Sequence, residues 1–510
     1  MFKILFALAV FLLLAAPGFA QCVDTAWVRT YNGPGNEDDK AFAMTVDALG
    51  NVYVTGQSYQ NGGRDDYVSI RYYPNGDTAW IRRYDGPISY DDQARAIAVD
   101  YSGNVLVTGL SWGDGTSEDY ATIKYNSDGD IAWVKRYNGE GDWADLALGL
   151  AVDASGNVYV TGWSWGSGTY EDYLTIKYLP NGDTAWVRRY NGPGDSTDIP
   201  YAIAVDASGS AYVTGASYGS ATDLDYATVK YGPDGSELWI ERYDGPGNSL
   251  DIAHALALDA SGNVIVAGRS SGITTGLDYA TIKYDPYGNQ LWADRYGGHQ
   301  LDDAASAVTS DASGNVYVTG TSVAQVTSYD YATLKYYSDG TRAWVKRYSG
   351  KGPSGSGTDY AYDIAVDDSG NVYVTGYAFG GYRAATVMYD GDGSTVWIER
   401  YPAEGGHAIA LDTSGNVYVG AVTVFEETSW DYLTIKYSLF DVEADPGDAN
   451  ADGIINISDL LFLLDFLYVN GGIPCPIETG DVDCNGVINL ADVVYLINYL
   501  YKGGPPPCGG

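Results

Sequence analysis

The chain has 510 residues, 66 of them acidic and 28 basic, so its formal net charge is −38. A surface this acidic repels nucleic-acid phosphates and anionic membranes, which excludes both as partners. The same surface suits calcium and keeps an exported protein in solution.

The N-terminus has the pattern of a secretory signal peptide. Residues 1–20 carry one Lys, an apolar run and the small-residue motif Gly18-Phe19-Ala20, which predicts cleavage after Ala20. Gln21 separates this motif from Cys22, which argues against a lipoprotein anchor. No later segment is long and apolar enough to span a bilayer. We therefore expect a protein that is secreted, extracellular or held at the cell surface.

Residues 21–440 are filled by a repeat. The motif D-x-x-G-N-V-Y-V-T-G occurs in eight copies, the last one degraded, and a Trp before a basic-rich strand recurs every 52 or 53 residues. Each unit reads as four strands, for example 94–100, 104–109, 119–125 and 130–137, joined by Asp-, Asn- and Gly-rich turns. This pattern predicts an all-β fold, an eight-bladed β-propeller of four-stranded blades. The alternative, an open solenoid, would carry atypical capping repeats, and the array has none.

The array begins in the middle of a repeat. Its last copy ends at 431–437 without a Trp strand, while residues 24–31 form a Trp strand without the other three. If these two segments pair, the ring closes and no sheet edge is left bare. We therefore predict that Trp27 and Tyr437 belong to the same blade.

The repeat resembles the SBBP-type bacterial β-propeller repeat over residues 24–437, on the strength of its D-x-x-G-N-x-Y-V-T-G unit. The resemblance implies the propeller fold in an exported or cell-surface protein. It implies no particular chemistry.

The composition changes at a short acidic linker, residues 441–446, and residues 447–510 form a second domain with small α-helices. Two D-x-[DN]-x-[DN]-G loops, 33 residues apart, each run into an amphipathic helical segment. Calcium takes oxygen ligands at loop positions 1, 3, 5, 7, 9 and 12, and Gly at position 6 makes the sharp turn. This spacing predicts two calcium ions. Their ligands are Asp448, Asn450, Asp452, the Ile454 carbonyl, Asn456 and Asp459 in the first loop, and Asp481, Asp483, Asn485, the Val487 carbonyl, Asn489 and Asp492 in the second.

This pair of loop-helix segments resembles a type I dockerin over residues 446–502, since position 12 is Asp and not the Glu of ordinary EF-hands. The resemblance implies docking to a cohesin-like module of a partner or a cell-surface protein. Dockerins often have a Ser/Thr pair after loop position 9, and this chain has Ile457-Ser458 and Leu490-Ala491 there. The alternative is a module that only caps or stabilises the C-terminus.

Four Cys in an exported chain allow three disulfide pairings. We favour a Cys484–Cys508 bridge, which would join the second loop to the chain end and leave Cys22 and Cys475 as a second pair.

The longer loops of the propeller fall on one face, where binding sites concentrate. Trp112, Trp143, Trp163 and Trp165 lie in the loops of two neighbouring blades and predict either a glycan platform or packing between blades. An acidic residue eight before each hairpin Asp recurs in every blade, and we expect this ring to be structural and to pair with the recurrent Arg three after each Trp. The acidic residues are Asp39, Asp92, Asp145, Asp198, Asp251, Asp303, Asp359 and Glu404.

The sequence contains no catalytic constellation. Its three His are not in zinc spacing or beside a nucleophile motif, and no Gly-rich phosphate loop opens a helix. We therefore expect a non-catalytic secreted binding or scaffold protein: the propeller presents a ligand or partner face, and the calcium module tethers it. The alternatives are an extracellular polysaccharide-active enzyme, with two isolated carboxylates in a cleft, and a purely structural envelope protein.

Overall fold

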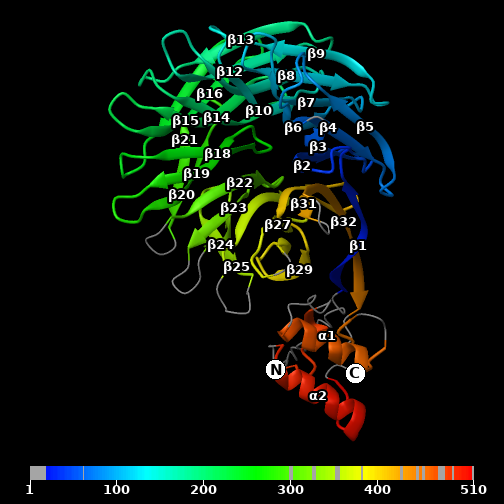
Figure 1. Cartoon of the computed structure of the whole chain (residues 1–510). Helices are drawn as coiled ribbons and strands as arrows, with labels where there is room; N and C mark the ends of the chain where they lie inside the picture. Colours follow the sequence, from blue (N-terminus) through cyan, green and yellow to red (C-terminus); the bar gives the residue numbers. More distant parts are fainter. Residues whose placement is uncertain are drawn as a thin grey trace, which may run out of the picture. The chain divides into compact units, whose positions relative to one another are not determined.

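The computed structural model describes residues 19–60, 63–297, 302–323, 329–350, 357–380, 383–424, 429–443, 447–450, 454–468, 477–484 and 488–507. The chain divides into two compact units, Thr25–Ser438 and a second unit of Met1–Asp24 with Leu439–Gly510. Within the described residues, the larger unit consists of eight four-stranded antiparallel sheets arranged around a common centre (Figure 1). The predicted eight-bladed propeller is confirmed.

Blades 1 to 7 are formed by consecutive strands. The bounds in blades 1 to 4 are β2 Asp39–Val46, β3 Val52–Gln60, β4 Arg64–Tyr72, β5 Thr78–Tyr84; β6 Gln93–Val99, β7 Val105–Trp112, β8 Glu118–Tyr125, β9 Ile131–Tyr137; β10 Asp145–Val152, β11 Val158–Trp165, β12 Glu171–Tyr178, β13 Thr184–Tyr190; β14 Asp198–Val205, β15 Ala211–Tyr218, β16 Leu224–Tyr231 and β17 Glu237–Tyr243. Those in blades 5 to 7 are β18 Asp251–Leu258, β19 Val264–Ser271, β20 Leu277–Tyr284, β21 Gln290–Tyr296; β22 Ala304–Ser310, β23 Val316–Val323, β24 Tyr329–Tyr336, β25 Arg342–Tyr348; β26 Tyr360–Val366, β27 Val372–Tyr377, β28 Ala384–Tyr389 and β29 Thr395–Tyr401. Blade 8 contains β30 Gly406–Leu411, β31 Val417–Val424, β32 Trp430–Glu443 and β1 Phe19–Tyr31.

The first strand of each blade is the innermost. These strands contact one another in sequence around the ring, from β2 to β6 and onward to β30, which contacts β2 again. The turn after each first strand is held by its Asp. In blade 1, Asp47 accepts hydrogen bonds from the backbone N–H groups of Leu49 and Asn51, both at 2.9 Å, and Gly50 takes the left-handed conformation with φ 78°.

The ring is closed by the two ends of the propeller segment. In blade 8 the strand order is β1-β32-β31-β30, so β1 lies beside β32 although the two come from opposite ends of the chain (Figure 1). The Trp27 indole also reaches blade 1, where its Nε1 donates to the Pro74 carbonyl at 3.0 Å. The predicted closure, with Trp27 and Tyr437 in one blade, is confirmed.

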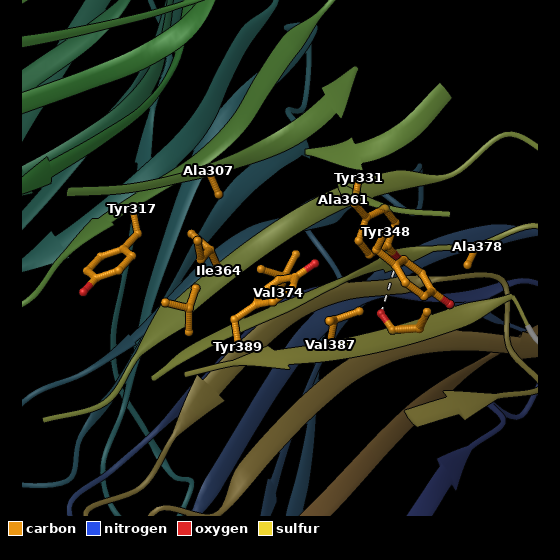
Figure 2. Close-up of a cluster of buried hydrophobic side chains, with 12 residues drawn as sticks. Ala307, Tyr317, Tyr331, Tyr348, Ala361, Ile364, Val374, Ala378, Val387 and Tyr389 are labelled. Atoms are coloured by element: carbon orange, nitrogen blue, oxygen red, sulfur yellow. Dashed lines mark hydrogen bonds between the residues drawn. The ribbon is translucent and has the colours of Figure 1, made fainter. Parts of the chain in front are cut away.

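Neighbouring blades are joined by buried aromatic side chains. Figure 2 shows the interface of blades 6 and 7, where Tyr317 and Tyr331 pack with Val374 and Val387. The Tyr331 hydroxyl donates to the Ala385 carbonyl of the next blade at 3.3 Å. Tyr67, Tyr120, Tyr173, Tyr226, Tyr279 and Tyr432 make the same bond at other interfaces. Because each phenol is buried and bonded, it fixes the spacing of two sheets.

Two boundaries differ from the sequence-based expectation. Strands β1 and β32 are longer than the other strands, with 13 and 14 residues. Residues 441–443, expected to be linker, are therefore strand, and 444–446 lie outside the described residues. β1 begins at Phe19, before the expected cleavage site; cleavage after Ala20 stays a prediction.

The smaller unit contains α1 Ile457–Tyr468, a short 3-10 helix η1 Ile477–Gly480 and α2 Leu490–Lys502. Its core includes Leu463, Val482 and Leu496, all fully buried. Among the helices of the described residues, none has the length and apolar character needed to cross a bilayer.

Candidate functional site

The two loops of the small unit are organised in the same way, each by an Asp at position 12. Asp459 and Asp492 are fully buried. The Asp492 carboxylate accepts the backbone N–H groups of Asp483 at 3.3 Å and Asn489 at 2.8 Å. Asp459 accepts the equivalent N–H groups of Asn450 and Asn456 at 3.1 and 2.7 Å. Each position-12 carboxylate therefore holds loop positions 3 and 9 in place.

The Asn at loop position 9 also caps the following helix. Asn489 is the N-cap of α2, its side chain accepts from the Ala491 N–H at 2.8 Å, and with Asp492 it completes a capping box. Asn456 accepts from the Ser458 N–H at 2.7 Å at the start of α1. Loop and helix therefore share residues, so that ordering one orders the other.

The second loop brings three carboxylates to one point. Asp481, Asp483 and Asp492 each offer an oxygen, and these oxygens lie within 4.8 Å of one another. Oxygens on opposite sides of a calcium ion are about 4.8 Å apart, because each Ca–O bond is about 2.4 Å. The donor set therefore fits calcium. The predicted ligands Asn485 and Val487 lie outside the described residues.

In the first loop, Asp448 and Asp459 are buried, and the Ile454 carbonyl accepts from the Asn456 side chain at 2.8 Å. The predicted ligand Asp452 lies outside the described residues. The placed residues follow the same order as those of the second loop, which is consistent with a second ion.

Cys484, at position 4 of the second loop, is in a disulfide and has a positive φ of 54°. Its predicted partner Cys508 lies outside the described residues, so that pairing stays a prediction, and so does the pairing of Cys22 with Cys475. The chain that leads to Cys508 folds back along α2, where the Tyr495 hydroxyl donates to the Pro506 carbonyl at 3.1 Å.

On the propeller, the four Trp do not form one platform. Trp143, 64% exposed, contacts Trp165 with ring centroids 5.8 Å apart, and Trp165 also contacts Tyr170 at 5.7 Å. Trp112 instead pairs with Tyr90 at 5.3 Å. Trp163 lies in the middle of β11, opposite Leu146 and Tyr173. The loop face therefore carries two separate aromatic groups.

The acidic ring is structural, as expected, but its predicted Arg partner is wrong. Asp92 accepts the backbone N–H groups of Gly86 at 2.6 Å and Trp112 at 3.1 Å, which ties a loop to a strand. The recurrent Arg bonds a different carboxylate: Arg83 pairs with Asp66 at 3.3 Å. The reason is register, since Arg83 lies opposite Val68 on the adjacent strand β4, whereas the ring carboxylates lie at or just before the start of first strands.

A feature that the sequence reasoning missed is a collar of side chains on the inner strands. Each first strand has a register shift that leaves one residue unpaired. The shift residues are Phe42, Arg95, Leu148, Tyr201, His254, Ser306, Tyr362 and His407. The sequence does contain a sign of the collar: one position of each Ala-rich first strand varies between blades while the neighbouring positions are similar.

Neighbouring collar residues stack on each other. The ring centroids of Tyr201 and His254 are 5.4 Å apart, and those of Tyr362 and His407 are 5.3 Å apart. Burial, followed by the charge of Arg269, lowers the pKa of His254 to about 4. These His are therefore neutral at pH 7 and behave as aromatic surface.

A cavity of about 230 Å³ adjoins the collar where blade 8 meets blade 1. It is lined by Lys40, Ala41, Phe42, Glu404, His407, Val422 and Trp430. The Lys40 ammonium lies 4.1 Å from the centre of the Trp430 ring, a cation–π contact. The cavity has an apolar floor with one acid and one base, so it can accept a small molecule that is part apolar and part polar.

Blade 7 departs from the repeat at its interface with blade 8. Arg383 and Ala384 replace the Asp and Tyr of the other third strands. Arg383 forms an ion pair with Glu404, and Ala384 cannot make the inter-blade phenol bond.

Comparison with known proteins agrees with both units. Residues 80–115, 140–168, 185–220 and 343–382 match the family described as beta-propeller repeat (SBBP), and residues 446–501 match the dockerin type I domain. An uncharacterized WD repeat-containing protein of Acanthamoeba polyphaga mimivirus is 25% identical over 357 residues, 62% of this chain and 22% of that protein. The chain thus spans less than a quarter of the length of that relative.

Among solved structures, the Dos1 propeller superposes with a TM-score of 0.51 at 9% identity, covering 80% of this chain and 94% of that one. The WD40 propeller domain of Doa1 gives 0.40 at 11% identity, over 68% and 92% of the two chains. Of these two superpositions, only that of the Dos1 propeller indicates a similar fold. The chain therefore carries β-propeller repeats of the SBBP kind and a C-terminal type I dockerin domain, a kind of module that generally binds calcium.

Proposed function

We propose that this protein is a secreted, non-catalytic binding protein whose dockerin domain holds two calcium ions and docks to a cohesin-like partner. Dockerin modules occur in extracellular bacterial assemblies, and the N-terminal leader pattern supports export. In such an assembly the propeller is the cargo and its loop face presents the binding surface.

The observation that carries docking is a repeated exposed apolar surface on both helices. Leu461 and Val494 are 58% and 48% exposed, and Ile457 and Leu490 are each 52% exposed. The members of each pair are 33 residues apart, so they occupy equivalent places in the two loop-helix segments. The opposite helix faces already fill the core with Leu463 and Leu496. Apolar side chains left in water on a small module favour a protein partner.

The test is capture of the exported protein fraction on the immobilised full chain, with calcium and with chelator. We expect one partner that is retained only with calcium and is lost when Leu461→Asp and Val494→Asp are combined. Tyr101→Asp, which changes a 91% exposed residue on a propeller hairpin, is the matched control and should retain the partner. Equal retention by the Leu461/Val494 variant would contradict docking through these helices and favour the capping role.

A glycan is the second candidate ligand, and the exposed Trp143 stacked on Trp165 favours it. Trp143→Ala should abolish retardation in gels that contain a soluble polysaccharide, while Trp112→Ala should not. The same polysaccharides should yield no new reducing ends. Their release would contradict the non-catalytic assignment and favour a polysaccharide-active enzyme. If no protein partner is found for the helices and no polysaccharide for the propeller loop face, the results would favour a structural envelope role.

A further inference from the structure

Three residue positions converge at each boundary between neighbouring blades. They are the Asp before the third-strand Tyr, the residue after the fourth strand, and the acidic residue at or next to the start of the following first strand. At the boundary of blades 1 and 2 all three are carboxylates, Asp66, Asp85 and Asp92. The same holds at the boundary of blades 4 and 5 for Asp225, Asp244 and Asp251.

Within each set, the three carboxylate oxygens lie within 4.8 Å of one another. The first and third members are buried and the middle one is exposed. One guanidinium accompanies each set: Arg83 is 3.3 Å from Asp66, and Arg242 is 2.8 Å from Asp225. When all three carboxyl groups are ionised, three negative charges face one positive charge, and each set is two charges short of neutrality.

The second set also has an unsatisfied oxygen, a feature that it shares with the equivalent carboxylates Asp119, Asp172, Asp278 and Asp431 at other boundaries. Oδ2 of Asp225 accepts from Arg242 at 2.8 Å and from Thr222 at 2.9 Å, but Oδ1 has no partner although the residue is only 4% exposed. A buried carboxylate oxygen without a donor is costly.

The direction of this oxygen is visible at the next boundary. There Gly297 takes the place of Asp244, and Asp278 takes the place of Asp225. A β-carbon built on Gly297 would overlap Oδ1 of Asp278. The bare oxygen of Asp225 is therefore aimed at the side chain of residue 244, another carboxylate.

We propose that each of these two sets binds one divalent cation, and that calcium is the ion that fits. All three side-chain ligands are oxygens that lie within 4.8 Å of one another, a separation that a single ion can bridge. Calcium accepts an irregular set of oxygen ligands, whereas magnesium requires a near-octahedral one. The exposed middle Asp leaves room for water molecules to complete the coordination.

Sequence differences between boundaries limit the inference to these two. Asn32, Asn138 and Asn191 replace the middle Asp at three other boundaries, which removes one charge. At the boundary of blades 7 and 8 the first Asp is replaced by Arg383, which pairs with Glu404. The chain thus places its own fixed positive charge where the other boundaries have two facing carboxylates.

Burial and the neighbouring carboxylates raise the pKa of Asp66 to about 7 and that of Asp92 to about 6. The pKa values of Asp244 and Asp251 are raised by the same causes.

The test compares the full chain with the double variant Asp85→Asn and Asp244→Asn, which gives both boundaries the residue of their natural counterparts. Each protein is dialysed against about 1 mM calcium, within the range for extracellular sites, and its bound calcium is counted by mass spectrometry. We expect the double variant to hold two fewer ions per chain. A module variant, Asp459→Ala with Asp492→Ala, should keep those two ions, which separates them from the dockerin sites.

Thermal melting gives an independent measurement. In chelator the double variant should melt no lower than the wild type, because the substitution removes repulsion. Adding calcium should raise the melting temperature of the wild type more than that of the double variant. Equal ion counts with equal calcium-dependent gains in melting temperature would overturn the proposal, and this outcome would leave calcium binding by the dockerin domain untouched.

Discussion

Removing the Trp27 side chain should open the ring. The indole is 8% exposed, lies between the rings of Tyr72 and Tyr418 with centroids 6.0 and 6.1 Å away, and donates its N–H to the Pro74 carbonyl. Truncation of a buried Trp to Ala costs about 3–5 kcal/mol, to which the lost hydrogen bond contributes about 1 kcal/mol. Since β1 and β32 come from opposite ends of the propeller segment and are neighbours in blade 8, this loss weakens ring closure.

The assay is urea unfolding followed by far-UV circular dichroism, with Trp186→Ala as the matched control. Trp186 is 6% exposed, lies 6.0 and 5.9 Å from Tyr159 and Tyr231, and donates to the Pro233 carbonyl at 3.2 Å, all within covalently continuous blades. A closed ring predicts similar losses for both variants. If Trp186→Ala lowers the midpoint strongly and Trp27→Ala leaves it at the wild-type value, β1 is a frayed end and the closure argument is refuted.

Three further predictions follow from single contacts. Trp397→Phe should cost about 1 kcal/mol less than Trp186→Phe in the same urea assay, because the buried Trp397 Nε1 has no acceptor to lose; equal costs would contradict this. His254, with its pKa lowered to about 4, binds fewer protons in the folded than in the unfolded protein, so the stability of the fold should decrease as the pH drops from 6.5 towards 4. His254→Leu, which introduces the residue found at the equivalent position 148, should reduce this pH dependence of the melting temperature. Asp492→Ala should lower the number of bound calcium ions by one. Because it also removes the capping box, it should lower the helical circular dichroism of the module even in chelator. Unchanged dichroism in chelator would show that the cap is not needed.

The sequence predicts the propeller well because repetition multiplies each local signal. A single D-x-x-G-N hairpin is weak evidence, whereas eight hairpins at nearly constant spacing leave few alternatives. The missing Trp strand after 431–437 predicted even the long-range pairing of β1 with β32. The extra length of β32 was not predictable, because the residues up to Glu443 carry no repeat signal.

Side-chain partners were harder to predict than strands. The Arg83–Asp66 pair depends on which residues face each other across β4 and β5, and a one-residue difference in register changes every partner. The grouping of Asp481, Asp483 and Asp492 was predictable because these residues follow a fixed spacing within one segment. The grouping of Asp66, Asp85 and Asp92 was not, since it needs two blades in their folded arrangement.

The departures from the repeat gather where the ring closes. At the interface of blades 7 and 8, Trp397 would donate to the hairpin between the third and fourth strands of the next blade, but in blade 8 these strands, β32 and β1, have no connecting hairpin. Arg383 and Ala384 change the same interface, and the 230 Å³ cavity lies one interface further, between blades 8 and 1. A larger cavity, of about 460 Å³, lies between the regular blades 1 and 2, so a change in the repeat is not needed to leave a cavity. What distinguishes the cavity at the ring closure is its position beside the collar and its lining, which includes an acid, a base and a Trp side chain, Glu404, Lys40 and Trp430.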